Sequence, residues 1–175
     1  MLQKLVLVLL SSMVWISPDE NLIDWNPSNK LDWSDFKARP DGSSSNAALT
    51  SSTINVEFAY DKNGLKHTIT CRFNKLKSWV RVKNNYILNH EQGHFDLAEI
   101  YARELHRKLK EYQFRKETAS EDLNKLYNRV MKEHLESQDL YDRQSNHSID
   151  STKQRYWDNK IKANLKELEA YADYR

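Results

Sequence analysis

His90-Glu91-Gln92-Gly93-His94 is an HExxH pattern inside a segment of helical periodicity. Residues four apart on a helix share a face, so His90 and His94 have the spacing at which two imidazoles bind one zinc ion. Glu91 lies roughly 100° around the helix from His90, beside the metal, where a base that activates water belongs. The stretch therefore predicts a helix with a metal site, with His90 and His94 as ligands and Glu91 as the catalytic residue.

Apolar residues continue the histidine face in both directions along this helix, which is predicted to run from Asn84 to Tyr112. They recur at helical spacing as Tyr86, Ile87, Leu97, Tyr101 and Leu105. The histidines should therefore face the interior. A buried imidazole nitrogen without a partner costs on the order of 1–3 kcal/mol, and a shared metal removes this cost for both rings. A pair of core histidines without metal is the plainer alternative.

Three other positions on this helix carry weaker expectations. Glycine weakens a helix, so its presence at Gly93 needs an explanation. Either another segment approaches the backbone closely there, or the glycine is simple sequence drift. Glu99 and Arg103 are four apart, as is typical of an ion pair on a helix surface. Asp96 points away from both histidines, so it can act only from behind the ligands.

The composition restricts the class of protein. The chain has 175 residues, enough for one domain with a buried core, expected at residues 18–175. Its 27 Lys and Arg nearly balance 25 Asp and Glu, and no basic stripe stands out, so no nucleic-acid partner is expected. Few Gly and Pro indicate a mainly helical protein. The single cysteine, Cys71, excludes an internal disulfide and is expected in the core.

Residues 1–17 have a different composition from the rest. A short positive start is followed by an almost wholly apolar stretch from Leu5 to Ile16. This has the length of a signal-peptide core and is short for a membrane span. It predicts export to the periplasm or beyond, although no clear cleavage site follows, and membrane association only through this segment. A buried N-terminal strand or helix is the alternative.

The rest of the chain predicts an α+β fold. Residues 49–60 and 64–74 alternate apolar and polar positions around Asn63-Gly64, a strong hairpin signal. A second helix is expected after a cap at Ser120, and a third from a capping box at Ser151-x-x-Gln154. We therefore expect a small antiparallel sheet or β-hairpin packed on the long HExxH helix, with two further C-terminal helices. The expected packing residues are Trp25, Trp33, Phe36, His67, Leu123, Leu126, Tyr127, Val130, Trp157, Ile161, Leu165, Leu168 and Ala172.

A third metal ligand must come from outside the motif. Catalytic zinc usually has three protein ligands and one open position, and Glu99 lies nearly opposite His90 on the helix. His147, in the loop before the third helix, is the leading candidate. His134 and Asp142 are the alternatives, and further carboxylates stand at Glu133, Glu136 and Asp139.

Several motifs of this chain resemble one bacterial family, domain of unknown function 922, whose members are usually described as zinc-dependent peptidases. The resemblance rests on Leu31-Asp32-Trp33-Ser34-Asp35-Phe36, Ala48-x-Thr50-Ser51, His90 to Asp96, Ala98 to Arg103, Tyr141-Asp142, His147, Gln154 and Trp157. The family's late motif is similar to Tyr-Asp-x-x-Thr-x-His-Gly, whereas this chain has Ser145 and Ser148 at the Thr and Gly places. The resemblance implies a zincin-like fold and export, and it implies no substrate.

Together these patterns predict a zinc metallopeptidase that acts on a peptide or protein. His90, His94 and His147 would hold Zn²⁺, and Glu91 would deprotonate the attacking water. An edge strand within 49–60 or 64–74 could pair with an extended peptide.

Other interpretations of the same patterns stay open. Tyr141 either donates a hydrogen bond to a developing oxyanion or only packs. One alternative function is a non-catalytic, zinc-stabilised cell-envelope binding module, closed by four protein ligands. Another is a helical interaction protein in which the histidines are incidental.

Overall fold

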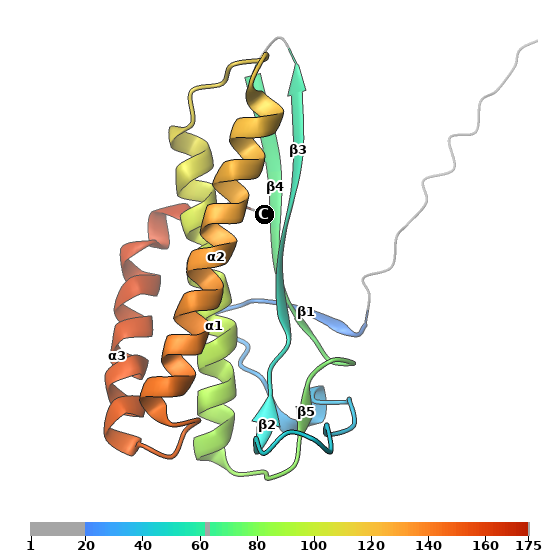
Figure 1. Ribbon diagram of the computed structural model, residues 1–175, viewed down its shortest axis with the longest axis vertical. Coiled ribbons are helices and arrows are strands. Elements are labelled where there is room, and N and C mark those ends of the chain that lie inside the picture. Colours follow the sequence, from blue (N-terminus) through green and yellow to red (C-terminus); the bar gives the residue numbers. More distant parts are fainter. Residues whose placement is uncertain (1–19, 62–63, 175) are drawn as a thin grey trace, which may run out of the picture.

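The computed structural model describes residues 20–61 and 64–174 (Figure 1). The predicted signal-like segment 1–17 and residues 62–63 of the expected hairpin turn lie outside this part. Within it, no helix is long and apolar enough to cross a membrane. The elements are β1 (Leu22–Asp24), η1 (Trp33–Asp35), β2 (Ala48–Leu49), β3 (Ser52–Asp61), β4 (Gly64–Asn74), β5 (Trp79–Val80), α1 (Asn85–Glu111), α2 (Ala119–Ser145), α3 (Ser151–Glu167) and η2 (Glu169–Tyr171).

The helices form one layer and the strands the other, with the β3–β4 hairpin running alongside α1 and α2 (Figure 1). β3 and β4 are antiparallel from Ser52↔Phe73 to Asp61↔Gly64, and β1 joins the other side of β4. β2 pairs separately with β5. The predicted strand 49–60 therefore breaks at Thr50–Ser51. The segment that pairs with it turns between β4 and β5, and the Ser51 N–H donates to the hydroxyl of Ser78 instead of to a strand. The α+β fold with a hairpin on the HExxH helix is confirmed.

α1 is buried around most of its circumference, because α2, α3 and the β3–β4 hairpin all pack on it. One side of α1 enters a core with the sheet, which includes Phe95, Ala98, Ala102, Leu105, Cys71 and Phe73. Another side packs on α2 and α3 through Leu97, Ile100, Tyr141, Trp157 and Ile161. The single apolar stripe predicted for this helix was therefore too narrow, and its first member, Tyr86, is 40% exposed.

Most predicted packing residues lie in these cores. Trp25, Phe36 and Cys71 are buried, and Trp33 packs against them from a partly buried position. The inner residues predicted for the second and third helices contact the same cores, with Ala172 in the tail beyond η2. His67 is partly buried on β4, where its Nε2 lies 2.8 Å from Nδ1 of His106 on α1.

The helix ends show where local patterns were misread. α1 begins one residue after Asn84, whose side chain accepts from the N–H of Ile87. Ser120 does not cap α2, which begins at Ala119, and the Thr118 hydroxyl there donates to Asp122. The capping box at Ser151 is also wrong. Asp150 is the N-cap of α3 and accepts two backbone N–H groups, which leaves the Gln154 side chain available for another role.

Glu99 and Arg103 form the predicted ion pair, but the prediction that it lies on the surface is wrong. Their exposed fractions are 1% and 5%, because α3 and the C-terminal tail cover this side of α1. Arg103 donates to Glu99 and to the carbonyl of Leu165, and it lies over the ring of Trp25. The Tyr174 hydroxyl donates to Glu99. The pair thus joins the N-terminal segment, α1, α3 and the tail.

Replacing Arg103 with alanine should destabilise the fold strongly, because it leaves the Glu99 carboxylate buried without its cation. We expect the free energy of unfolding to fall by about 3–5 kcal/mol, measured by urea denaturation. The matched control is Lys125→Ala, which breaks the exposed i,i+4 pair with Glu121 on α2. Equal urea midpoints for the two variants would contradict a structural role for the buried pair.

Candidate metal centre

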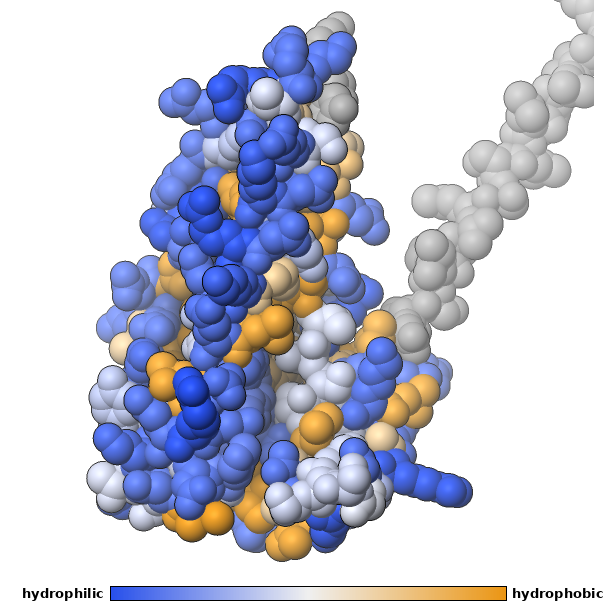
Figure 2. Space-filling view, in the orientation of Figure 1, coloured by the Kyte–Doolittle hydropathy of each residue, from blue (hydrophilic) through white to orange (hydrophobic). Residues whose placement is uncertain are grey.

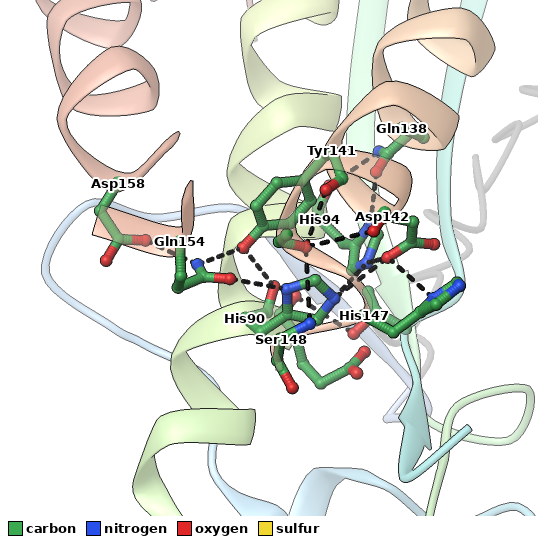
Figure 3. Close-up of polar contacts among 12 residues, drawn as sticks. His90, His94, Gln138, Tyr141, Asp142, His147, Ser148, Gln154 and Asp158 are labelled. Atoms are coloured by element: carbon green, nitrogen blue, oxygen red, sulfur yellow. Dashed lines mark hydrogen bonds and ion pairs between the residues drawn. The ribbon is translucent and has the colours of Figure 1, made fainter. Parts of the chain in front are cut away.

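Three potential ligand atoms from two helices converge on one point (Figure 3). Nε2 of His90 and Nε2 of His94, both from α1, lie 3.2 Å apart. Each lies 3.1 Å from Oδ1 of Asp142, which projects from the end of α2. The structure therefore brings together the two predicted histidines and Asp142, one of the alternatives for the third ligand.

The far nitrogen of each imidazole faces a glutamine oxygen. Nδ1 of His90 lies 2.9 Å from Oε1 of Gln154 on α3, and Nδ1 of His94 lies 2.6 Å from Oε1 of Gln138 on α2. The amide nitrogens of both glutamines donate elsewhere, to the carbonyl of His94 and to the hydroxyl of Tyr141. The amide oxygens must therefore accept, so the imidazole protons sit on Nδ1.

With both protons on Nδ1, the Nε2 lone pairs point at a carboxylate oxygen. Such an arrangement is favourable only when a cation lies among the three atoms, and this cation can be either a proton or a metal ion. Burial lowers the pKa of His94, but its hydrogen bond to Asp142 and the charges of Asp142 and Glu91 outweigh this and raise it. Burial raises the pKa of Asp142, but its contacts with the two histidines hold it well below its usual range. The site is therefore built to hold positive charge.

Tyr141 forms a platform under both imidazoles. Its fully buried ring stacks on His90 at 4.5 Å between centroids and meets the edge of His94 at 4.9 Å. Its hydroxyl donates to the carbonyl of His90 and accepts from Gln154. Burial raises the pKa of this hydroxyl, so it stays protonated. Because the hydroxyl is already engaged, the geometry favours the packing role over the oxyanion role.

Gly93 is required where Tyr141 lies against α1. A Cβ atom at this position would lie 2.4 Å from the Tyr141 hydroxyl oxygen and 2.9 Å from Cζ of its ring. Of the two alternatives left open for Gly93, the structure shows the close approach of another segment, and that segment is α2.

A cleft of about 350 Å³ opens over the three ligand atoms. Figure 2 shows a hollow between the helical side of the molecule and the side that carries β2. Residues 46–52 line the cleft opposite α2, and the Thr50 hydroxyl ties them to α1 by donating to the carbonyl of Glu91. Glu91 also lines the cleft and is only 4% exposed, yet its Oε2 has no hydrogen-bond partner within the described residues. A buried carboxylate oxygen in this state is poised for an incoming donor.

His147, the leading sequence candidate for the third ligand, lies beside the cluster. Its side chain is 52% exposed, lines the cleft, and places Nδ1 3.5 Å from Oδ1 of Asp142. Asn146, His147 and Ser148 all have positive φ, at 48°, 49° and 72°. Each such residue costs roughly 1–2 kcal/mol, and backbone bonds from His147 and Asp150 to the end of α2 hold the turn.

The other candidates lie outside the cluster. His134 is buried, and Gln138 links it to His94. Burial and the charge of His94 lower the pKa of His134 to about 4, so it is neutral. Asp96 accepts from the indole of Trp25 and from Gln92, which fixes the N-terminal segment against α1. Of the α2 carboxylates, Glu136 and Asp139 pair on the surface with Lys132 and Arg143.

Sequence reasoning missed the two glutamines that orient the histidines. Gln154 was assigned to a capping box, which the Asp150 cap rules out. Gln138 gave one usable signal, its position four residues before Asp142 on the same helical face. That spacing would have placed the side chains of Gln138 and Asp142 over the same pair of imidazoles.

Gly93→Ala should disturb both folding and metal binding, because the methyl group displaces Tyr141 from under the histidines. We expect the free energy of unfolding to fall by about 1–3 kcal/mol, although alanine is the better helix former. Urea denaturation and zinc titration measure the two effects. Gly42→Ala is the control, since nothing lies within 4 Å of a Cβ there. If the two variants have the same free energy of unfolding and the same zinc affinity, the close contact between Gly93 and Tyr141 does not require glycine.

Gln138→Leu should weaken metal binding by about 10–100-fold, because the Nδ1 proton of His94 loses its acceptor. Gln138→Glu keeps an acceptor at the same place and should lose less. Competition with a chromophoric chelator gives the affinities. Identical affinities for the leucine variant and the parent chain would refute the orienting role.

The chain was also compared with known proteins. A family model described as bacterial protein of unknown function (DUF922) matches residues 17–148, which include the HExxH helix, Asp142 and His147. No curated protein and no solved structure matches the chain. Because the match covers most of the chain, the protein belongs to this bacterial family of unknown function.

Proposed function

We propose that this chain is a zinc-dependent hydrolase that cleaves peptide bonds. One observation carries the proposal: a buried carboxylate oxygen of Glu91, with no hydrogen-bond partner among the residues that the structure describes, lies on the same cleft as three converging metal-ligand atoms. A structural site would need no such carboxylate. A zincin-like arrangement, and export directed by the signal-like segment, belong to the same proposal.

The donor set fits zinc. Two imidazole nitrogens and one carboxylate oxygen are typical ligands of catalytic zinc. Ligands about 2.0–2.1 Å from a tetrahedral ion lie about 3.3 Å from one another, and the three atoms here are 3.1–3.2 Å apart. Asp142 is therefore the third ligand of this proposal. His147, 3.5 Å from the same oxygen, is the second candidate.

Glu91 carries the proton transfers. When bound, zinc would polarise a substrate carbonyl and lower the pKa of water. Glu91 accepts the proton of the attacking water at Oε2 and delivers it to the leaving nitrogen, as general base and then general acid. Glu91 is almost completely buried, so its surroundings have a low dielectric constant. Electrostatic interactions that stabilise charge during these transfers are stronger there than in water.

The wall opposite α2 supports a polypeptide substrate. The carbonyls of Ala47 and Ser51 accept from Arg81 and Asn74, so these odd-numbered residues face β5 and β4. Within β2 and β3, strand alternation then turns the backbone N–H and C=O groups of Ala48 and Ser52 to the other side. These residues line the cleft. An extended peptide could add to this edge by backbone hydrogen bonds.

Glu91→Gln tests the proposal directly. The variant should bind as much zinc as the parent chain, because Glu91 is not a ligand, while hydrolysis of an unfolded protein substrate should fall by at least about 10²-fold. Elemental analysis gives the zinc content, and release of labelled fragments gives the rate. Asp142→Ala should lose zinc, whereas His147→Ala should retain it.

Each contrary result has a clear meaning. Undiminished hydrolysis by Glu91→Gln would disprove the proposed chemistry. Bound zinc without hydrolysis by the parent chain would favour the zinc-stabilised envelope module. Loss of zinc in His147→Ala but not in Asp142→Ala would make His147 the third ligand.

A further inference from the structure

The α2 wall of the cleft presents a large apolar side chain to solvent. Leu135 is 66% exposed, although it lines the cleft next to the buried His134. On the opposite wall, Leu49 of β2 is 37% exposed. An exposed apolar residue alone is ordinary. Here, two of them line the same cleft, one on α2 and one on β2.

The same cleft is poor in charge. Charged residues make up 30% of the chain. Among residues 20–61 and 64–174, however, no Lys or Arg lines the cleft, and Glu91 and Asp142 are its only carboxylates. Both belong to the metal centre. The rest of the described lining consists of small, apolar and amide or hydroxyl side chains, together with histidines, of which His134 is neutral.

We propose that Leu135 and Leu49 determine specificity and that the cleft selects extended polypeptide segments with an apolar side chain beside the metal centre. This inference rests on the proposed function and names its substrate class. When an apolar substrate side chain binds between Leu135 and Leu49, apolar surface of all three side chains is removed from water. A Lys side chain in the same place would lose hydration and find only the two carboxylates that the metal centre already uses. An Asp side chain would lose hydration with no Lys or Arg in the described lining, and it would find positive charge only at the metal centre.

Binding can be measured separately from hydrolysis. The protein is full-length Glu91→Gln with added zinc, and the probes are three end-blocked fluorescent hexapeptides that differ only in a central Leu-Leu, Lys-Lys or Asp-Asp pair. Fluorescence polarisation should show the Leu-Leu peptide bound about ten-fold more tightly than either charged peptide. Leu135→Lys in the same background should abolish this preference and favour Asp-Asp.

The matched control is Leu76→Lys in the same background. Leu76 is 57% exposed, lies in the turn between β4 and β5, and is outside the cleft lining. This variant should keep the preference for Leu-Leu. A change of selectivity in Leu76→Lys as large as that in Leu135→Lys would show a general charge effect and overturn the inference.

The remaining outcomes separate this inference from the function on which it rests. Equal affinity for the three peptides, no binding of any of them, or unchanged selectivity in Leu135→Lys would overturn it, even if the parent chain hydrolyses peptides. A preference for Leu-Leu that Leu135→Lys removes would support it. If the parent chain then hydrolysed no peptide, the proposed chemistry alone would fail.

Discussion

The site depends on two hydrogen bonds that lie behind the ligands. Gln154 and Gln138 accept the Nδ1 protons of His90 and His94, which fixes both Nε2 lone pairs toward Asp142. Without these acceptors either ring could carry its proton on Nε2 and bond directly to the carboxylate, and no cation would be needed. Because the acceptors are neutral amides, they orient the rings without adding negative charge behind them. The demand for positive charge therefore comes from the lone pairs and Asp142.

The fold holds this arrangement by surrounding α1. The two glutamines come from different helices, α2 and α3, so both helices must be docked before the imidazoles are oriented. Tyr141 sets the distance between α1 and α2, since its ring fits against α1 only over Gly93. On the other side, residues 46–52 are held to the helix through Thr50 and the carbonyl of Glu91. The cleft is thus the space left where the helical layer and the sheet layer do not meet.

Local patterns in the sequence identified what a single helix determines. The helical spacing of apolar residues around HExxH predicted α1 to within a residue at each end, and alternation with Asn63-Gly64 predicted the hairpin. The sequence could not show which side chains other elements bring to α1. Glu99 and Arg103 looked like a surface pair because their burial depends on α3 and the tail. Asp142 ranked below His147 because its position depends on α2 continuing to Ser145, through the segment before the loop.

The strained turn after α2 connects Asp142 to the mouth of the cleft. Ser148 has φ of 72°, a backbone conformation that glycine adopts without cost. The buried Ser145 hydroxyl donates to the carbonyl of Tyr141. The N–H of His147 donates to the carbonyl of Asp142 itself. The bonds that hold the turn in its strained form therefore also hold Asp142 at the end of α2, and strain of this kind persists where the surrounding structure fixes a functional residue.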